Sequence, residues 1–411
     1  MYIKIENDNE TLTKYTEITN LSYAPETDLT GQSLPIDEFY VDVITEENIS
    51  IGRPAFLYDD NDMLWCEYWI VSSIRLDSST VRIHAQSLIT KLDRRTVAPL
   101  WANGTTAYKV VNNSLVNLQS SDAYTIIADT LSSIGSSNYS IDVNFQNVTL
   151  TGYCPEQTAR ERLQWICIAI GAIVRTTFSD KIRIEPLYDT YDEVPLSDVY
   201  WRPSMEYSDY VTDLNFTYFT FTAQNTLPQG DVEWINFYQG IYIVVNRTDF
   251  TLHNTDPMIT SLTPQSEINI DDVYFINENN VDDVAKNFAQ FFFSRQEIEA
   301  DVINNRSYQP ADLIHLPINN VDEDGHIVTG YIDTCDFTFG NQAKSHIHFK
   351  VQEEIETTKL IINYKYGNTI LQRKRFNLPI GMSYEIENPY PDKISSGHRY
   401  VYYPKNEKAT Y

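Results

Sequence analysis

The chain has 411 residues, of which 42% are hydrophobic and 21% are charged, proportions that are typical of globular domains. These values exclude a wholly disordered, collagen-like or coiled-coil chain, and the length suffices for roughly two to four domains. Aromatic residues make up 13% of the chain, while Gly and Pro number only 14 and 17. This bias favours half-buried β-strands over long helices.

Acidic residues outnumber basic residues 57 to 30, which gives a formal net charge of -27. A chain this anionic repels phosphate backbones, so we expect no sequence-specific binding of nucleic acid. The charge is distributed unevenly. Residues 359–411 hold nine basic and four acidic side chains, whereas residues 1–358 hold 21 basic and 53 acidic side chains. This change of sign predicts a domain boundary after residue 358.

The N-terminus and the cysteines indicate the cellular compartment. The first ten residues, MYIKIENDNE, lack the basic and apolar regions of a signal peptide, and the longest apolar run, 165–174, is too short to span a bilayer. We therefore expect synthesis in the cytoplasm without membrane insertion. Four cysteines lie far apart with no C-x-x-C spacing, so we expect them to be buried small hydrophobes: Cys66, Cys154, Cys167 and Cys335.

Residues 1–95 predict a run of β-strands. The apolar patterns lie at 2–5, 39–44, 55–58, 63–74 and 81–89. Two polar clusters of hairpin-loop length, 59–62 and 77–80, separate the later strands. An antiparallel meander that closes into a small barrel is the simplest arrangement for this segment.

Residues 96–200 predict a small α/β domain. Helical periodicity first appears at Ile126, Ile127 and Leu131, after the capping candidates Ser121 and Asp122. A second helix is predicted over 158–171, because Thr158 and Glu161 have the spacing of a capping box and Gly171 suits the C-terminal end. A hairpin of 172–177 and 182–187 follows at once.

Residues 201–358 predict a second β region, with strands at 213–222 and 235–245. A helix is expected over 281–297, with an apolar face that includes Phe288 and Phe291. A last strand pair, 327–339 and 346–352, should turn at Gly340 and Asn341. Residues 359–411 then form a small, basic, all-β module with several turn signals.

Searches for catalytic chemistry find little. Neither of the two common Gly-rich phosphate-binding motifs occurs in the sequence. The metalloprotease motif H-E-x-x-H and the hydrolase motif G-x-S-x-G are absent as well, so no cofactor, metal or catalytic residue is predicted. His346 and His348 would share one face of a strand, but no third metal ligand lies near them in the sequence. Asp322 and Asp324 begin like a calcium loop, yet the expected later carboxylate is missing, so we interpret this stretch as a turn. We expect the protein not to be an enzyme.

Several core and turn patterns resemble the tail hub proteins of bacteriophages that infect Gram-positive hosts and of phage-derived tail particles. The capped helix and the hairpin after it carry the clearest likeness. The stretches that carry it are 158–175, 180–187, 52–60, 64–71, 83–88, 92–94 and, more weakly, Tyr331-Ile-Asp and the hairpin before residue 355. This resemblance covers most of the chain.

The resemblance implies a homotrimeric ring at the distal end of a tail. Each subunit would contribute two β-barrel-like hub domains, with the small α/β domain and the C-terminal β module attached. The implied partners are distal tail, tube and baseplate proteins and the tape measure protein, and the implied location is the virion tail or a phage-derived particle. Two other functions stay open: a tail-associated hydrolase of peptidoglycan or glycan that uses carboxylates such as Asp322 and Asp324, and a carbohydrate-binding adsorption module.

The basic C-terminal module offers one candidate binding site. Arg373, Lys374 and Arg375 follow each other in a run that otherwise predicts a strand. In a strand, the two arginines point to one face and Lys374 to the other, so the arginines together could bind an anion. The expected partner is a neighbouring tail protein or an anionic cell-wall polymer. The alternative is that these residues contact the acidic body of their own chain.

Overall fold

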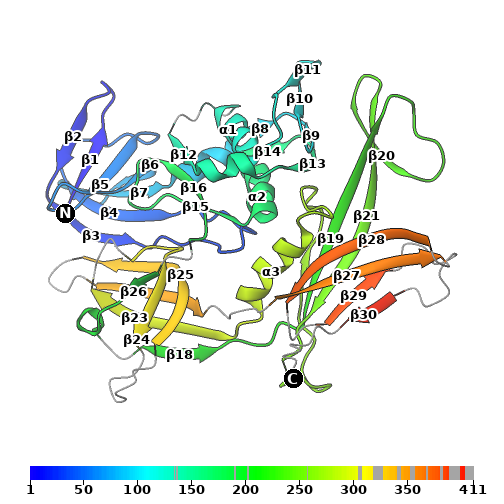
Figure 1. The fold of residues 1–411 in the computed structure, drawn as a ribbon. Helices are drawn as coiled ribbons and strands as arrows, with labels where there is room; N and C mark the ends of the chain where they lie inside the picture. Colours follow the sequence, from blue (N-terminus) through cyan, green and yellow to red (C-terminus); the bar gives the residue numbers. More distant parts are fainter. Residues whose placement is uncertain are drawn as a thin grey trace. The chain divides into compact units, whose positions relative to one another are not determined.

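The computed structural model describes residues 1–133, 135, 138–188, 191–200, 203–256, 258–303, 308–317, 327–339, 344–351, 357–366, 369–379, 383–387 and 399–402, with the backbone alone beyond residue 351. The chain divides into two compact units (Figure 1). Unit 1 comprises Met1–Leu150, Cys154–Glu206 and Gln296–Val351, and unit 2 comprises Thr151–Tyr153, Tyr207–Arg295 and Gln352–Tyr411.

A thirteen-stranded sheet dominates unit 1. Its main path runs β18-β23-β26-β25-β3-β4-β7-β6-β5-β1-β2, and β24 joins β17 to β25. The strands are β1 (Tyr2–Glu6), β2 (Leu12–Tyr15), β3 (Ile18–Tyr23), β4 (Glu38–Ile44), β5 (Pro54–Tyr58), β6 (Leu64–Arg75), β7 (Thr80–Gln86), β17 (Tyr191–Glu193), β18 (Ser204–Tyr207), β23 (Gln296–Ile303), β24 (Leu313–Pro317), β25 (Ile327–Thr338) and β26 (Lys344–Val351).

The two ends of unit 1 meet where β3 pairs with β25, at Tyr23 and Phe337. The rings of these two residues stack with centroids 5.6 Å apart, and Trp65 packs edge-on against Phe337 at 4.9 Å. All three side chains are buried, and aromatic pairs of this kind add about 0.5–1.5 kcal/mol to the stabilisation from area burial. The core of unit 1 is therefore continuous across strands that lie more than 300 residues apart in the sequence.

The α/β part of unit 1 lies between these strands in the sequence. Its central helix, α2 (Ala159–Ile170), begins with a complete capping box between Thr158 and Glu161 and ends at Gly171, which has a φ of 64°. The other elements are η1 (Leu88–Arg94), β8 (Thr96–Val97), β9 (Leu100–Asn103), β10 (Ala107–Val111), β11 (Ser114–Asn117), α1 (Ala123–Ser133), β12 (Tyr139–Ile141), η2 (Val143–Asn147), β14 (Gln157–Thr158), β15 (Ala172–Arg175), β16 (Ile182–Pro186) and η3 (Leu196–Asp198).

Unit 2 is built on the long antiparallel pair of β19 (Asp213–Gln224) and β21 (Ile241–His253), which is conspicuous in Figure 1. Helix α3 (Val281–Phe292) packs on β19, where Phe288 meets Phe216 edge-on with ring centroids 5.6 Å apart. The other elements are β13 (Thr151–Cys154), which unit 2 shares with unit 1, β20 (Glu233–Tyr238), β22 (Glu267–Ile270), β27 (Thr357–Tyr366), β28 (Thr369–Pro379), β29 (Ser383–Glu387) and β30 (Arg399–Tyr402).

The mainly β fold with an α/β insertion is confirmed. The capped helix and the hairpin after it lie as predicted, and Asp122 caps α1 through the backbone N–H of Thr125 at 2.7 Å. The third helix is shorter than expected: it ends at Phe292, because the residues from Gln296 onward alternate between buried and exposed positions and form β23. The strand expected over 81–89 ends at Gln86, and η1 follows it.

Domain boundaries at residues 95, 200 and 358 stay a prediction. Strands from 1–95 share one sheet with strands from 296–351, and β29 pairs with β21. The predicted turn at Gly340 and Asn341 lies outside the described residues. No helix in the described part of the chain is long and apolar enough to cross a membrane.

Candidate functional site

The residues predicted to bind a partner lie on β28. Arg373, Lys374 and Arg375 pair in register with Asn363, Ile362 and Ile361 of β27. The strand predicted for this run is therefore present. The structure describes only the backbone here, so the role of the three side chains stays a prediction.

His346 and His348 share one face of β26, as predicted from their spacing, and each faces a carboxylate. Nδ1 of His346 lies 2.9 Å from Asp301, and Nδ1 of His348 lies 2.6 Å from Asp333. The hydrogen bond with Asp333 raises the pKa of His348. No cluster of His, Cys, Asp and Glu suited to a metal ion occurs among the described residues. The two histidines belong to a ladder of cross-strand charge pairs.

All four cysteines are buried, as predicted. Burial raises the pKa of each thiol, and that of Cys167 rises to about 12. Because the thiolate is the nucleophile, such thiols react poorly at neutral pH. The carboxylates of the alternative hydrolase hypothesis, Asp322 and Asp324, lie outside the described residues.

A buried carboxylate links the main sheet of unit 1 to its α/β part. Asp37, next to β4, accepts hydrogen bonds from the backbone N–H of Glu26 at 3.0 Å and from the hydroxyl of Thr176. The hydroxyl of Tyr68 lies 3.3 Å from that of Thr176. Burial outweighs these hydrogen bonds and raises the pKa of Asp37 to about 6. At neutral pH the buried carboxylate is charged, and keeping it buried therefore lowers the stability of the fold.

A second buried link joins β15 to the loop before β24. Arg175, with 4% of its side chain exposed, donates to the Asp312 carboxylate at 2.6 Å and to the carbonyl of Ala311 at 3.0 Å. Its neighbour Arg183 donates to Gln309 at 3.0 Å. Burial raises the pKa of Asp312 and lowers that of Arg183. Buried charges in this arrangement fix the α/β part against the sheet.

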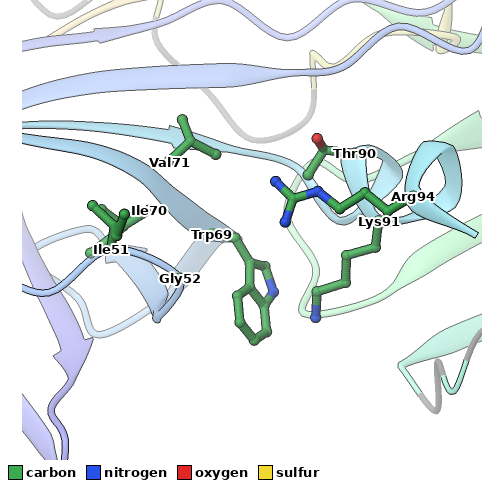
Figure 2. A pocket seen from close by; sticks show the side chains of 8 residues that line it. All are labelled: Ile51, Gly52, Trp69, Ile70, Val71, Thr90, Lys91 and Arg94. Atoms are coloured by element: carbon green, nitrogen blue, oxygen red, sulfur yellow. The ribbon is translucent and has the colours of Figure 1, made fainter.

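A small pocket lies between β6 and η1 (Figure 2). We call it the Trp69 pocket; its volume is about 170 Å³, and it is lined by Ile51, Gly52, Trp69, Ile70, Val71, Thr90, Lys91 and Arg94. Nζ of Lys91 lies 3.3 Å from the centroid of the Trp69 ring, a close cation–π contact. The indole N–H of Trp69 is shielded from solvent and has no hydrogen-bond partner within the described part of the chain.

Charges around the Trp69 pocket are partly desolvated. Burial is the main reason why the pKa of Glu67 rises to about 7, and the nearby Lys91 opposes that rise. Burial also lowers the pKa of Lys91. Sequence reasoning missed this pocket. Its only local signal is the three-residue spacing of Lys91 and Arg94, because Trp69 comes from a distant strand.

Comparison with solved structures identifies the fold. A tail protein from Neisseria meningitidis MC58 matches with a TM-score of 0.55 at 11% identity, over 86% of this chain and 96% of that one. The 43 kDa tail protein of prophage MuSo2 from Shewanella oneidensis matches with a TM-score of 0.52 at 10% identity, over 86% of this chain and 98% of that one. The chain has the fold of these phage tail proteins. No protein-family model and no curated protein matches its sequence.

This likeness bears out the resemblance to tail proteins at the level of the fold. Both matches include nearly the whole of the other chain, so the similarity covers the architecture and not one common motif. At about a tenth identity, the functional residues do not transfer from one chain to the other.

Proposed function

We propose that the chain is a structural hub protein of a phage tail or phage-derived particle. In this proposal it forms a homotrimeric ring at the distal end of the tail and connects the tail tube to the baseplate or tip. The observation that carries the proposal is the shared fold with two tail proteins over 86% of the chain. A fold alone does not determine function, so the assembly has to be tested directly.

The proposed role depends on shape and binding, without catalysis. Buried links through Asp37 and Arg175 hold the α/β part of unit 1 to its main sheet, as a rigid ring component requires. The acidic excess of residues 1–358 suits a passage for DNA, because carboxylates repel the phosphate backbone and would not retain it. The proposed partners are other copies of the chain, tube and baseplate proteins and the tape measure protein, all in the virion tail.

Assembled particles should contain three copies of the chain in one ring, because a heterologous contact that closes on itself forms a cyclic oligomer. Native mass spectrometry of isolated tail ends gives the copy number, and electron microscopy shows the ring. A single copy per particle would contradict the hub proposal. The mass of the purified chain alone does not decide this point, because closure can require neighbouring tail proteins.

We propose further that β28 makes an outward contact through its two arginines. Reversing both charges, in Arg373→Glu with Arg375→Glu, should abolish binding to a neighbouring tail protein or to an anionic cell-wall polymer. Co-assembly into particles and retention on purified cell walls measure the two cases separately. Lys374→Glu is the control, because strand alternation predicts that Lys374 lies on the opposite face from the two arginines. Unchanged binding with faster proteolysis near Thr358 would instead favour a contact with the chain's own body.

A further inference from the structure

The Trp69 pocket presents two cations on one side. Lys91 and Arg94 are three residues apart on η1, and side chains at this spacing eclipse each other on a 3₁₀-helix. Figure 2 shows both side chains extending from η1 toward the strand that carries Trp69. The local conformation therefore directs two positive charges at the same small volume.

These cations are unusual in this chain because neither forms an ion pair with a carboxylate, although the charge of the buried Glu67 acts on Lys91 over a longer distance. Among the Lys and Arg residues whose side chains the structure describes, only four make no side-chain hydrogen bond, ion pair or ring contact. They are Arg94, Arg95, Lys181 and Lys286. Among the described residues, Lys91 contacts the Trp69 ring and forms no side-chain hydrogen bond or ion pair. Lys91 and Arg94 therefore place two positive charges at one pocket of a chain whose net charge is -27.

The lining of the Trp69 pocket determines the class of ligand. The two cations call for a ligand with negative charge. Ile51, with 65% of its surface exposed, adds an apolar rim. The volume of about 170 Å³ lies below the range of about 300–1,000 Å³ that is usual for cofactor and small-molecule sites. A carboxylate side chain fits these properties better than a cofactor does.

We propose that the Trp69 pocket receives a carboxylate side chain from a second copy of this chain. This inference rests on the proposed ring and names one of its contacts. Copies that each carry a net charge of -27 repel one another, so a stable contact must set cations of one copy against acids of the next. A basic pocket on one copy and an acidic surface on its neighbour also make a heterologous contact, the kind that closes into a ring.

A purely local role for the cations makes a different prediction. Lys91 and Arg94 lie in the last turn of η1, where positive charge stabilises the carbonyl end of a helix. If they act only there, their loss changes stability and leaves association unchanged. Association therefore has to be measured together with thermal unfolding.

The test compares two variants that lose the same charge. Lys91→Gln with Arg94→Gln should raise the dissociation constant for self-association at least about tenfold, as measured by sedimentation. The control variant, Lys181→Gln with Lys286→Gln, removes two other unpaired cations. Its dissociation constant for self-association should stay within about twofold of the wild-type value. Equal association of the wild type and the pocket variant would overturn the proposal. If the purified wild-type chain stays monomeric, incorporation into particles is compared instead, and equal incorporation of the wild type and the pocket variant would overturn the proposal.

Cross-linking tests the same contact without substitution. A mixture of unlabelled and nitrogen-15-labelled chain, treated with a carbodiimide, should yield peptides in which Lys91 of one label is joined to an acidic residue of the other. Links from Lys91 only within one copy would overturn the proposal even if the variant associates weakly through partial unfolding. The hub proposal is judged separately, by the copy number in assembled particles.

Discussion

Replacing Asp312 by alanine should lower the free energy of unfolding of unit 1 by about 3–5 kcal/mol, because it leaves the buried guanidinium of Arg175 without its closest counter-charge. Glu185 lies 3.6 Å from Arg175, but it also pairs with Arg183. Urea unfolding followed by tryptophan fluorescence measures the loss. Five of the six tryptophans lie in the residue ranges of unit 1, so this signal reports mainly on that unit.

Two further variants show whether burial causes the loss. Asp8→Ala removes a carboxylate that lies 3.1 Å from Arg53 but is 72% exposed, and it should cost at most about 1 kcal/mol. Arg175→Met combined with Asp312→Leu removes both buried charges and should recover much of the loss. A cost for Asp312→Ala as small as that for Asp8→Ala would mean that the link is not buried in solution.

The sequence predicts those parts of the fold that short-range chemistry determines. The capping box of α2 and the turn at 59–62 each depend on side chains within a few residues of the backbone groups they bind. The end of α3 was missed because no glycine or proline marks it: Phe293 extends the apolar run by one residue, and only the buried positions of β23 show that the periodicity has changed. The end of α2 could be predicted because Gly171 marks it, whereas α3 ends without such a residue.

Long-range pairing is what the sequence could not show. The contact of β3 with β25 joins Tyr23 to Phe337, and β25 carries a bulge between Ile332 and Thr334 that no local pattern indicates. The same reason hides the Trp69 pocket. The predicted strand ended at residue 89 and no element was predicted for Lys91 and Arg94, whereas η1 aligns these two side chains and packs them beside β6. The pocket exists only through that packing.

Asp37→Asn should make unit 1 more stable at pH 8 and remove part of its dependence on pH. The folded pKa of about 6 lies above the ordinary value of 3.8, so the folded state holds the proton more tightly than the unfolded state. Stability from this group is therefore greatest below about pH 4 and falls as the pH rises toward 6. Above pH 6, the buried charge costs about 3 kcal/mol. Asparagine carries no charge and avoids this cost. The net gain in stability is smaller by the free energy lost in the altered hydrogen bond to Thr176.

Asp42 provides a control of opposite sign on the adjacent strand. Its carboxylate is buried, but the two hydrogen bonds from Arg82, at 2.7 and 2.9 Å, lower its pKa. Asp42→Asn should thus destabilise unit 1 at pH 8, and its effect should shrink as the pH falls through the folded pKa and the wild-type carboxyl takes up a proton. Urea unfolding at pH 3, pH 5 and pH 8 compares both variants with the wild type: the effect of Asp37→Asn changes between pH 8 and pH 5, and that of Asp42→Asn changes only below about pH 4. If Asp37→Asn is the less stable protein at pH 8, its hydrogen bonds to Glu26 and Thr176 outweigh the cost of the buried charge, and the carboxylate is a net stabilising link.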